Sequence, residues 1–112
     1  MKEFIAYLGS KVEEGKSETA ALLADGRRDD ANFAKIRMNI YDVCRTVTRV
    51  LSAKPGAGAG AVKAQLERFR GEWSAALEKA KQHSDVSGIA VEETKLAALD
   101  DVIARFQEVD EA

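Results

Sequence analysis

The 112-residue sequence is poor in the residues that build disulfides, metal sites and helix breaks. Its single cysteine, Cys44, cannot form a disulfide within the chain, and a zinc site made of cysteines is excluded. Its single histidine, His83, lies in no Glu-x-x-His motif of the kind that di-iron bundles use. The single proline, Pro55, and the many Ala, Glu, Lys and Leu residues favour long helices. We therefore expect no metal and no cofactor.

Long apolar runs are absent as well. No run approaches the ~20 residues that a membrane span needs, and the opening stretch MKEFIAYLGSKVEE meets charge too early for a secretory signal. Apolar residues make up 46% and charged residues 32% of the chain, a balance typical of soluble globular proteins. A chain of this length can bury a sufficient hydrophobic core without a disulfide or a metal to stabilise it. The sequence predicts one soluble, cytoplasmic domain over residues 1–112 that makes no membrane contact.

Apolar residues recur at helical spacing in four segments, which predict helices over residues 2–25, 30–53, 60–83 and 90–109. The clearest run alternates steps of three and four, and we expect it to face the bundle; it comprises Phe33, Ile36, Ile40, Val43, Val47 and Val50. Four helices of this length with short connections indicate an all-α, antiparallel up-and-down four-helix bundle.

Glycines occur at the ends of these segments and inside them. Gly26 is suited to the left-handed conformation that ends a helix, and Asp29 or Asp30 is suited to cap the next one. Gly15 falls inside the first segment, where it either kinks the helix or admits a close neighbour. The stretch PGAGAG at residues 55–60 has the spacing G-x-G-x-G and follows a helix, whereas a dinucleotide-binding turn needs G-x-G-x-x-G after a strand. We interpret it as a connection between two helices.

Other motif fragments fail on spacing. Gly15, Lys16 and Ser17 match the end of a phosphate-binding loop, but its first glycine is missing and the context is an amphipathic helix. His83, Ser84 and the aspartate that follows are adjacent in the chain, so their side chains do not converge as a catalytic triad requires. Cys44 flanks an apolar stripe and Trp73 falls in one, and both suit structural roles. No catalytic site is expected.

A second row of residues recurs on the segment 30–53, on another face, and comprises Ala34, Met38, Tyr41, Arg45 and Thr48. Either this helix is sandwiched inside the bundle, or its second face contacts another chain. Tyr, Met and Arg are enriched at protein interfaces. Met38, Tyr41 and Arg45 are therefore the candidate partner-binding residues.

Charge is unevenly distributed along the chain. Residues 27–54 carry seven basic and three acidic side chains, whereas residues 85–112 carry two basic and eight acidic ones. Either the acidic segment lies beside the basic one, or the basic segment meets an anionic partner. Asp29, Asp30 and Asp42 interrupt the basic set, and its cations spread around the helix, which argues against nucleic-acid binding.

These observations predict a small non-enzymatic helical bundle that acts through protein–protein contacts, as a homodimer or with another protein. The alternative is a nucleic-acid or anion-binding module that uses the basic segment 27–54. A third hypothesis is a small-ligand-binding bundle or helical enzyme, because a cavity in a bundle core leaves no sequence signature.

Overall fold

The computed structural model describes residues 1–56 and 58–111, which form four helices and no strand. Their bounds are Lys2–Ala24 for α1, Arg28–Ser52 for α2, Gly58–Gln82 for α3 and Val86–Glu111 for α4. The predicted all-α four-helix bundle is therefore confirmed. Every helix begins and ends within about two residues of the predicted bounds, apart from the start of α4.

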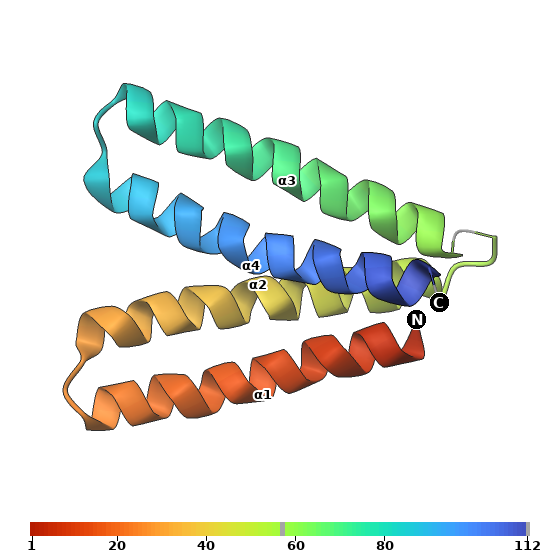
Figure 1. The fold of residues 1–112 in the computed structure, drawn as a ribbon, viewed down its shortest axis with the longest axis horizontal. Coiled ribbons are helices and arrows are strands. Elements are labelled where there is room, and N and C mark those ends of the chain that lie inside the picture. Colours follow the sequence, from red (N-terminus) through yellow and green to blue (C-terminus); the bar gives the residue numbers. More distant parts are fainter. Residues whose placement is uncertain (57, 112) are drawn as a thin grey trace.

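The helices pair as two antiparallel hairpins, α1 with α2 and α3 with α4 (Figure 1). The hairpins come together at the end that holds both termini and the α2–α3 connection, and they diverge toward the other end. α2 and α4 contact each other and both remaining helices, whereas α1 and α3 do not touch. The side of α2 that faces away from α4 is therefore open between α1 and α3.

The hydrophobic core is concentrated at the end where the hairpins meet. Phe4 near the start of α1 packs edge-to-face on Phe106 near the end of α4, with ring centroids 5.4 Å apart. All four helices contribute fully buried side chains around this pair, among them Leu8, Cys44, Val62, Leu66, Leu99 and Val102. Burial of this apolar area holds the hairpins together, and the diverging ends contribute little to it.

Local signals explain where helices end and begin. Gly26 adopts a left-handed φ of 74° directly after α1, as predicted. The predicted start of the last helix at residue 90 is wrong, because α4 begins at Val86. The Asp85 carboxylate accepts a hydrogen bond from the Gly88 N–H at 3.0 Å and so caps a free amide of the first turn. The sequence HSD is thus a connection with a helix cap.

The helices α1 and α2 approach each other closely at Gly15. A Cβ at this position would lie 2.7 Å from the Met38 Cβ, which is shorter than any ordinary contact. Of the two roles expected for Gly15, the structure therefore shows the close approach. The resulting α1–α2 pairing is the most extensive helix contact in the molecule, and it decides which face of α2 is buried.

Candidate protein-interaction surface

The structure places the candidate residues Met38, Tyr41 and Arg45 together on one face of α2. That face is turned toward α1 of the same chain and, at Tyr41, toward α4. Met38 is half-buried against Gly15, and Tyr41 retains only 8% of its surface. These two side chains therefore have extensive contacts inside the chain, and their contact with a partner stays a prediction.

Tyr41 anchors a polar contact between α2 and α4. Its hydroxyl donates a hydrogen bond of 3.4 Å to Asp101 Oδ2, and its ring packs edge-to-face on Tyr7 at 6.5 Å between centroids. Burial raises the pKa of the Tyr41 hydroxyl well above its ordinary value, and the neighbouring Tyr7 and Asp101 raise it further. The phenol is therefore a neutral hydrogen-bond donor at physiological pH, which suits a structural contact.

Arg45 lies at the edge of the α1–α2 contact with 23% of its side chain exposed. Its Nη2 pairs with Asp42 Oδ1 at 2.7 Å, while its buried Nε has no hydrogen-bond partner among the described residues. A hollow beside it is lined by α1 residues, including Gly9 and Glu13. Arg45 is thus the one charged candidate of the three, and part of its side chain stays exposed.

The stripe expected to face the bundle does so only in part, because Ile40 belongs to the core and the other members lie at the edge of the buried face or outside it. Val43 is 41% exposed and Val50 is 55% exposed, whereas Ala34 and Thr48 of the second row are fully buried. Both rows are apolar enough to be buried, so composition alone does not choose between them. The close approach at Gly15 turns the second row toward α1 and leaves the outer valines uncovered.

A row of uncharged residues runs along the open side of α2, and we name it the α2 seam. Its members follow alternating steps of three and four, and all but the half-buried Ile36 are exposed; they are Ile36, Asn39, Val43, Thr46, Val50 and Ala53. The Thr46 hydroxyl donates to the Asp42 carbonyl at 3.0 Å, so its hydrogen bond is already made. A seam of this spacing is typical of helices that pair with another helix.

The signal that would have revealed the α2 seam was present in the sequence. Across residues 36–53 of a strongly basic segment, this one row carries no charged side chain. Interface cores are depleted in charged residues, so the missing charge is as informative as the apolar residues themselves. The row was overlooked because Asn39 and Thr46 are polar and interrupt a purely apolar pattern.

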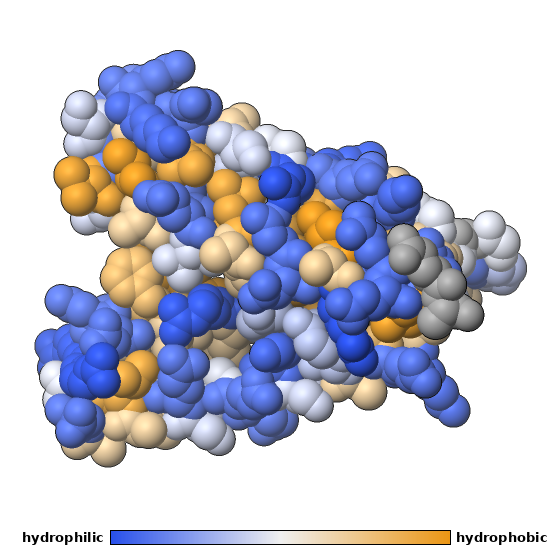
Figure 2. All heavy atoms as spheres, in the orientation of Figure 1, coloured by the Kyte–Doolittle hydropathy of each residue, from blue (hydrophilic) through white to orange (hydrophobic). Residues whose placement is uncertain are grey.

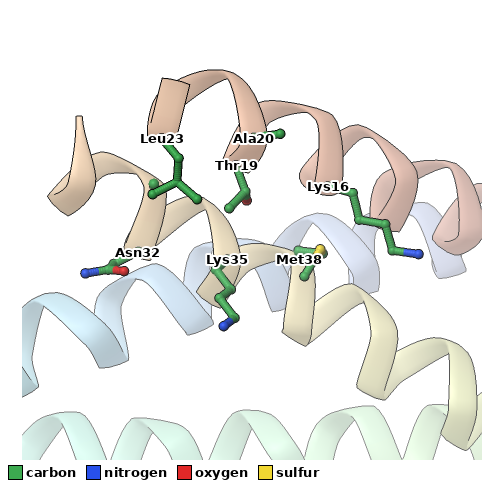
Figure 3. A pocket seen from close by; sticks show the side chains of 8 residues that line it. Lys16, Thr19, Ala20, Leu23, Asn32, Lys35 and Met38 are labelled. Carbon is green, nitrogen blue, oxygen red and sulfur yellow. The ribbon is translucent and has the colours of Figure 1, made fainter. Parts of the chain in front are cut away.

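Two hollows flank the N-terminal part of α2. One of about 350 Å³ lies between α1 and α2, where Leu23 and Thr19 face Lys35 and Met38 (Figure 3). The other, of about 420 Å³, lies between the diverging hairpins, where Phe33 of α2 is opposite residues at the start of α4. Figure 2 shows the notch between the hairpins, with hydrophobic surface on its α3/α4 side.

The basic residues of α2 are partly neutralised inside the chain. Arg27 pairs with Asp30 at 2.7 Å, and Arg37 of α2 pairs with Glu18 of α1 at 2.9 Å. The acidic helix α4 contacts both α2 and α3, and Asp100 of α4 forms an ion pair with Arg70 of α3. The uneven charge along the sequence is therefore accounted for in part by contacts between neighbouring helices.

The surroundings of Cys44 and Trp73 suit structural roles for both side chains. Cys44 is fully buried, and this burial raises the pKa of its thiol to about 12, so it is neither ionised nor accessible. Trp73 stacks on Phe69 at 5.0 Å, and Lys95 Nζ lies 4.9 Å from its ring centroid. Among the described residues, no three His, Cys, Asp or Glu side chains gather as a metal site would require.

The comparisons with known proteins assign neither a family nor a function. No family model, curated protein or solved structure matches the chain. Over the described residues, no helix combines the length and apolar character needed to cross a bilayer.

Proposed function

We propose that the protein is a non-catalytic interaction module that self-associates as a homodimer. The observation that carries this proposal is the α2 seam, an uncharged row left exposed on a helix that otherwise contacts every other helix of the bundle. Val43 and Val50 on this row keep 41% and 55% of their surfaces in solvent. Covering such apolar area is favourable, and a second molecule offers the same row.

The lone cysteine supports a place of action in a reducing compartment, the cytoplasm. Cys44 is buried and takes part in no disulfide, whereas small proteins of oxidising compartments commonly rely on such bonds.

The solution mass of the native chain tests self-association. Size-exclusion chromatography with light scattering should give twice 12.2 kDa at high protein concentration. A mass of 12.2 kDa at every concentration would contradict the proposal.

A second candidate function is the binding of nucleic acid or another polyanion by α2. It is favoured by four exposed basic side chains on or beside α2 with no ion pair in the described structure: Arg28, Lys35, Arg49 and Lys54. If all four contacted phosphates, affinity for a short DNA duplex would fall by about 150-fold between about 50 and about 200 mM salt. Binding without such salt dependence, or no binding at low salt, would exclude this function.

A further inference from the structure

The α2 seam has two edges with different side chains. Ile36, Val43 and Val50 recur at seven-residue intervals along one edge, and Asn39, Thr46 and Ala53 recur along the other. Seven residues are about two helical turns, so each edge is nearly straight along the helix. When two copies of such a helix lie antiparallel, the first edge of one faces the second edge of the other.

One antiparallel register uses the whole seam. It places Val43 opposite the partner's Thr46, Val50 opposite the partner's Asn39, and Ile36 opposite the partner's Ala53. The two most exposed valines of α2 would then both be covered. Because Thr46 already donates its hydroxyl hydrogen within its own helix, placing it against Val43 leaves no donor unsatisfied.

Charge complementarity selects the same register. Asp42 and Arg49 lie beside the seam on the side away from α3 and α4, and each retains exposed surface. They are seven residues apart, about 10 Å along the helix, and cannot pair with each other in one chain. In the antiparallel register, Asp42 lies opposite the partner's Arg49, and symmetry forms this pair twice.

A parallel arrangement lacks this match. In a parallel pair, Asp42 and Arg49 would face the row that holds Ile40 and Val47. That row is uncharged, and Ile40 is buried against the rest of its own bundle. Asp42 already pairs with Arg45 of its own chain through Oδ1, and about half of its side chain stays exposed. The antiparallel orientation therefore adds a partner for Arg49, which the parallel one does not.

The size of the seam sets the strength of the contact. From Ile36 to Ala53 it extends about 26 Å along a helix about 10 Å wide, which is well below the ~800 Å² per partner of a standard interface. We expect a dimer that dissociates on dilution through the micromolar range.

Resting on the proposed self-association, we propose that a second copy of the chain docks on the α2 seam, with α2 antiparallel to the partner's α2 and Asp42 opposite the partner's Arg49. The dimer axis then crosses the seam between Val43 and Thr46, midway between Ile36 and Ala53. Ile36, at one end of the seam, also lines the hollow between the hairpins, and the other seam residues do not.

Charge reversal tests the register. Asp42→Arg and Arg49→Asp each convert two attractive pairs into two repulsive ones, so each should raise the dimer dissociation constant by about tenfold. The double variant restores opposite charges and should return the constant to within about threefold of the native value. Asp42→Arg also breaks the pair with Arg45 within its own chain, so all these variants are made on an Arg45→Gln background, with Arg45→Gln alone as the reference. Failure of the double variant to recover on this background would overturn the register, because residues 42 and 49 cannot reach each other within one chain.

A matched pair of apolar substitutions tests the surface. Val50 and Leu23 are both 55% exposed and both lie in the last turn of their helices, but only Val50 belongs to the seam. Val50→Asp should raise the dissociation constant by at least about 100-fold, and Leu23→Asp should leave it unchanged. Circular dichroism should show native helix content in both, because each site is exposed.

Sedimentation equilibrium of these variants separates the possible failures. A native chain that dimerises while Val50→Asp dimerises equally well would overturn the seam and leave self-association standing. A native chain that is monomeric at all concentrations would overturn the proposed function and the seam together.

Discussion

Replacing Gly15 with alanine tests the contact that orients α2. The added Cβ would lie 2.7 Å from the Met38 Cβ and 3.4 Å from its Cα. Because these atoms are fixed to the backbone of α2, the clash is relieved only by separating the two helices. Overpacking at such a contact costs about 3 kcal/mol, at the upper end of its range, while alanine improves helix propensity by about 1 kcal/mol.

The net expectation for Gly15→Ala is a loss of about 2 kcal/mol in the free energy of unfolding, which lowers the melting temperature by about 8 °C. Gly71→Ala in α3 is the matched control, because a Cβ there meets no atom within 4 Å. The control receives only the propensity gain and should be stabilised by about 1 kcal/mol.

Urea denaturation followed by circular dichroism, at equal protein concentration for both variants, measures the difference. We expect the two unfolding free energies to differ by about 3 kcal/mol, with Gly71→Ala the more stable. Equal stabilisation of both variants would refute the close approach of α1 and α2, and with it the account of why the α2 seam is exposed.

Three further predictions concern the α3–α4 connection and the buried ionisable groups. Asp85→Ala removes the acceptor for the Gly88 N–H and should cost about 1 kcal/mol in thermal unfolding; an unchanged midpoint would exclude the cap. Ser84→Gly relieves a left-handed φ of 52° and should raise stability by about 1 kcal/mol in urea; a loss would show that the serine side chain matters more than the strain. Burial raises the pKa of the Cys44 thiol to about 12 and that of Tyr41 further, so the folded chain keeps protons that the unfolded chain releases. Both groups therefore stabilise the fold fully below about pH 8.5. Above the pKa that each group has in the unfolded chain, the free energy of unfolding should fall by up to about 1.4 kcal/mol per pH unit for that group. A pH dependence of stability that is unaffected by Cys44→Ala would contradict this origin for the thiol.

The fold was largely predictable because its signals are local. Alternating steps of three and four located each helix, and Gly26 and Pro55 marked two of the connections. The start of α4 was missed because Asp85 lies in a polar stretch that reads equally well as a loop, and its capping bond depends on the backbone around it. The divergence of the two hairpins has no local signal, since it reflects where the large buried side chains gather.

The orientation of α2 was less predictable than its existence. Its two rows are both rich in residues that tolerate burial, and the choice between them depends on a neighbour distant in the sequence, Gly15 of α1. Their spacing in the sequence therefore predicts Met38 and Tyr41 as a distinctive group, and the structure shows this group in contact with α1 and α4. The exposed seam became visible only once that contact was known.

The most direct test of the central claim is the mass of the native protein in solution as a function of concentration. Light scattering or sedimentation equilibrium from about 1 µM to about 200 µM should show a mass that rises from 12.2 kDa toward twice that value. A mass of 12.2 kDa across the whole range would show that the α2 seam pairs with no second copy and would contradict the account.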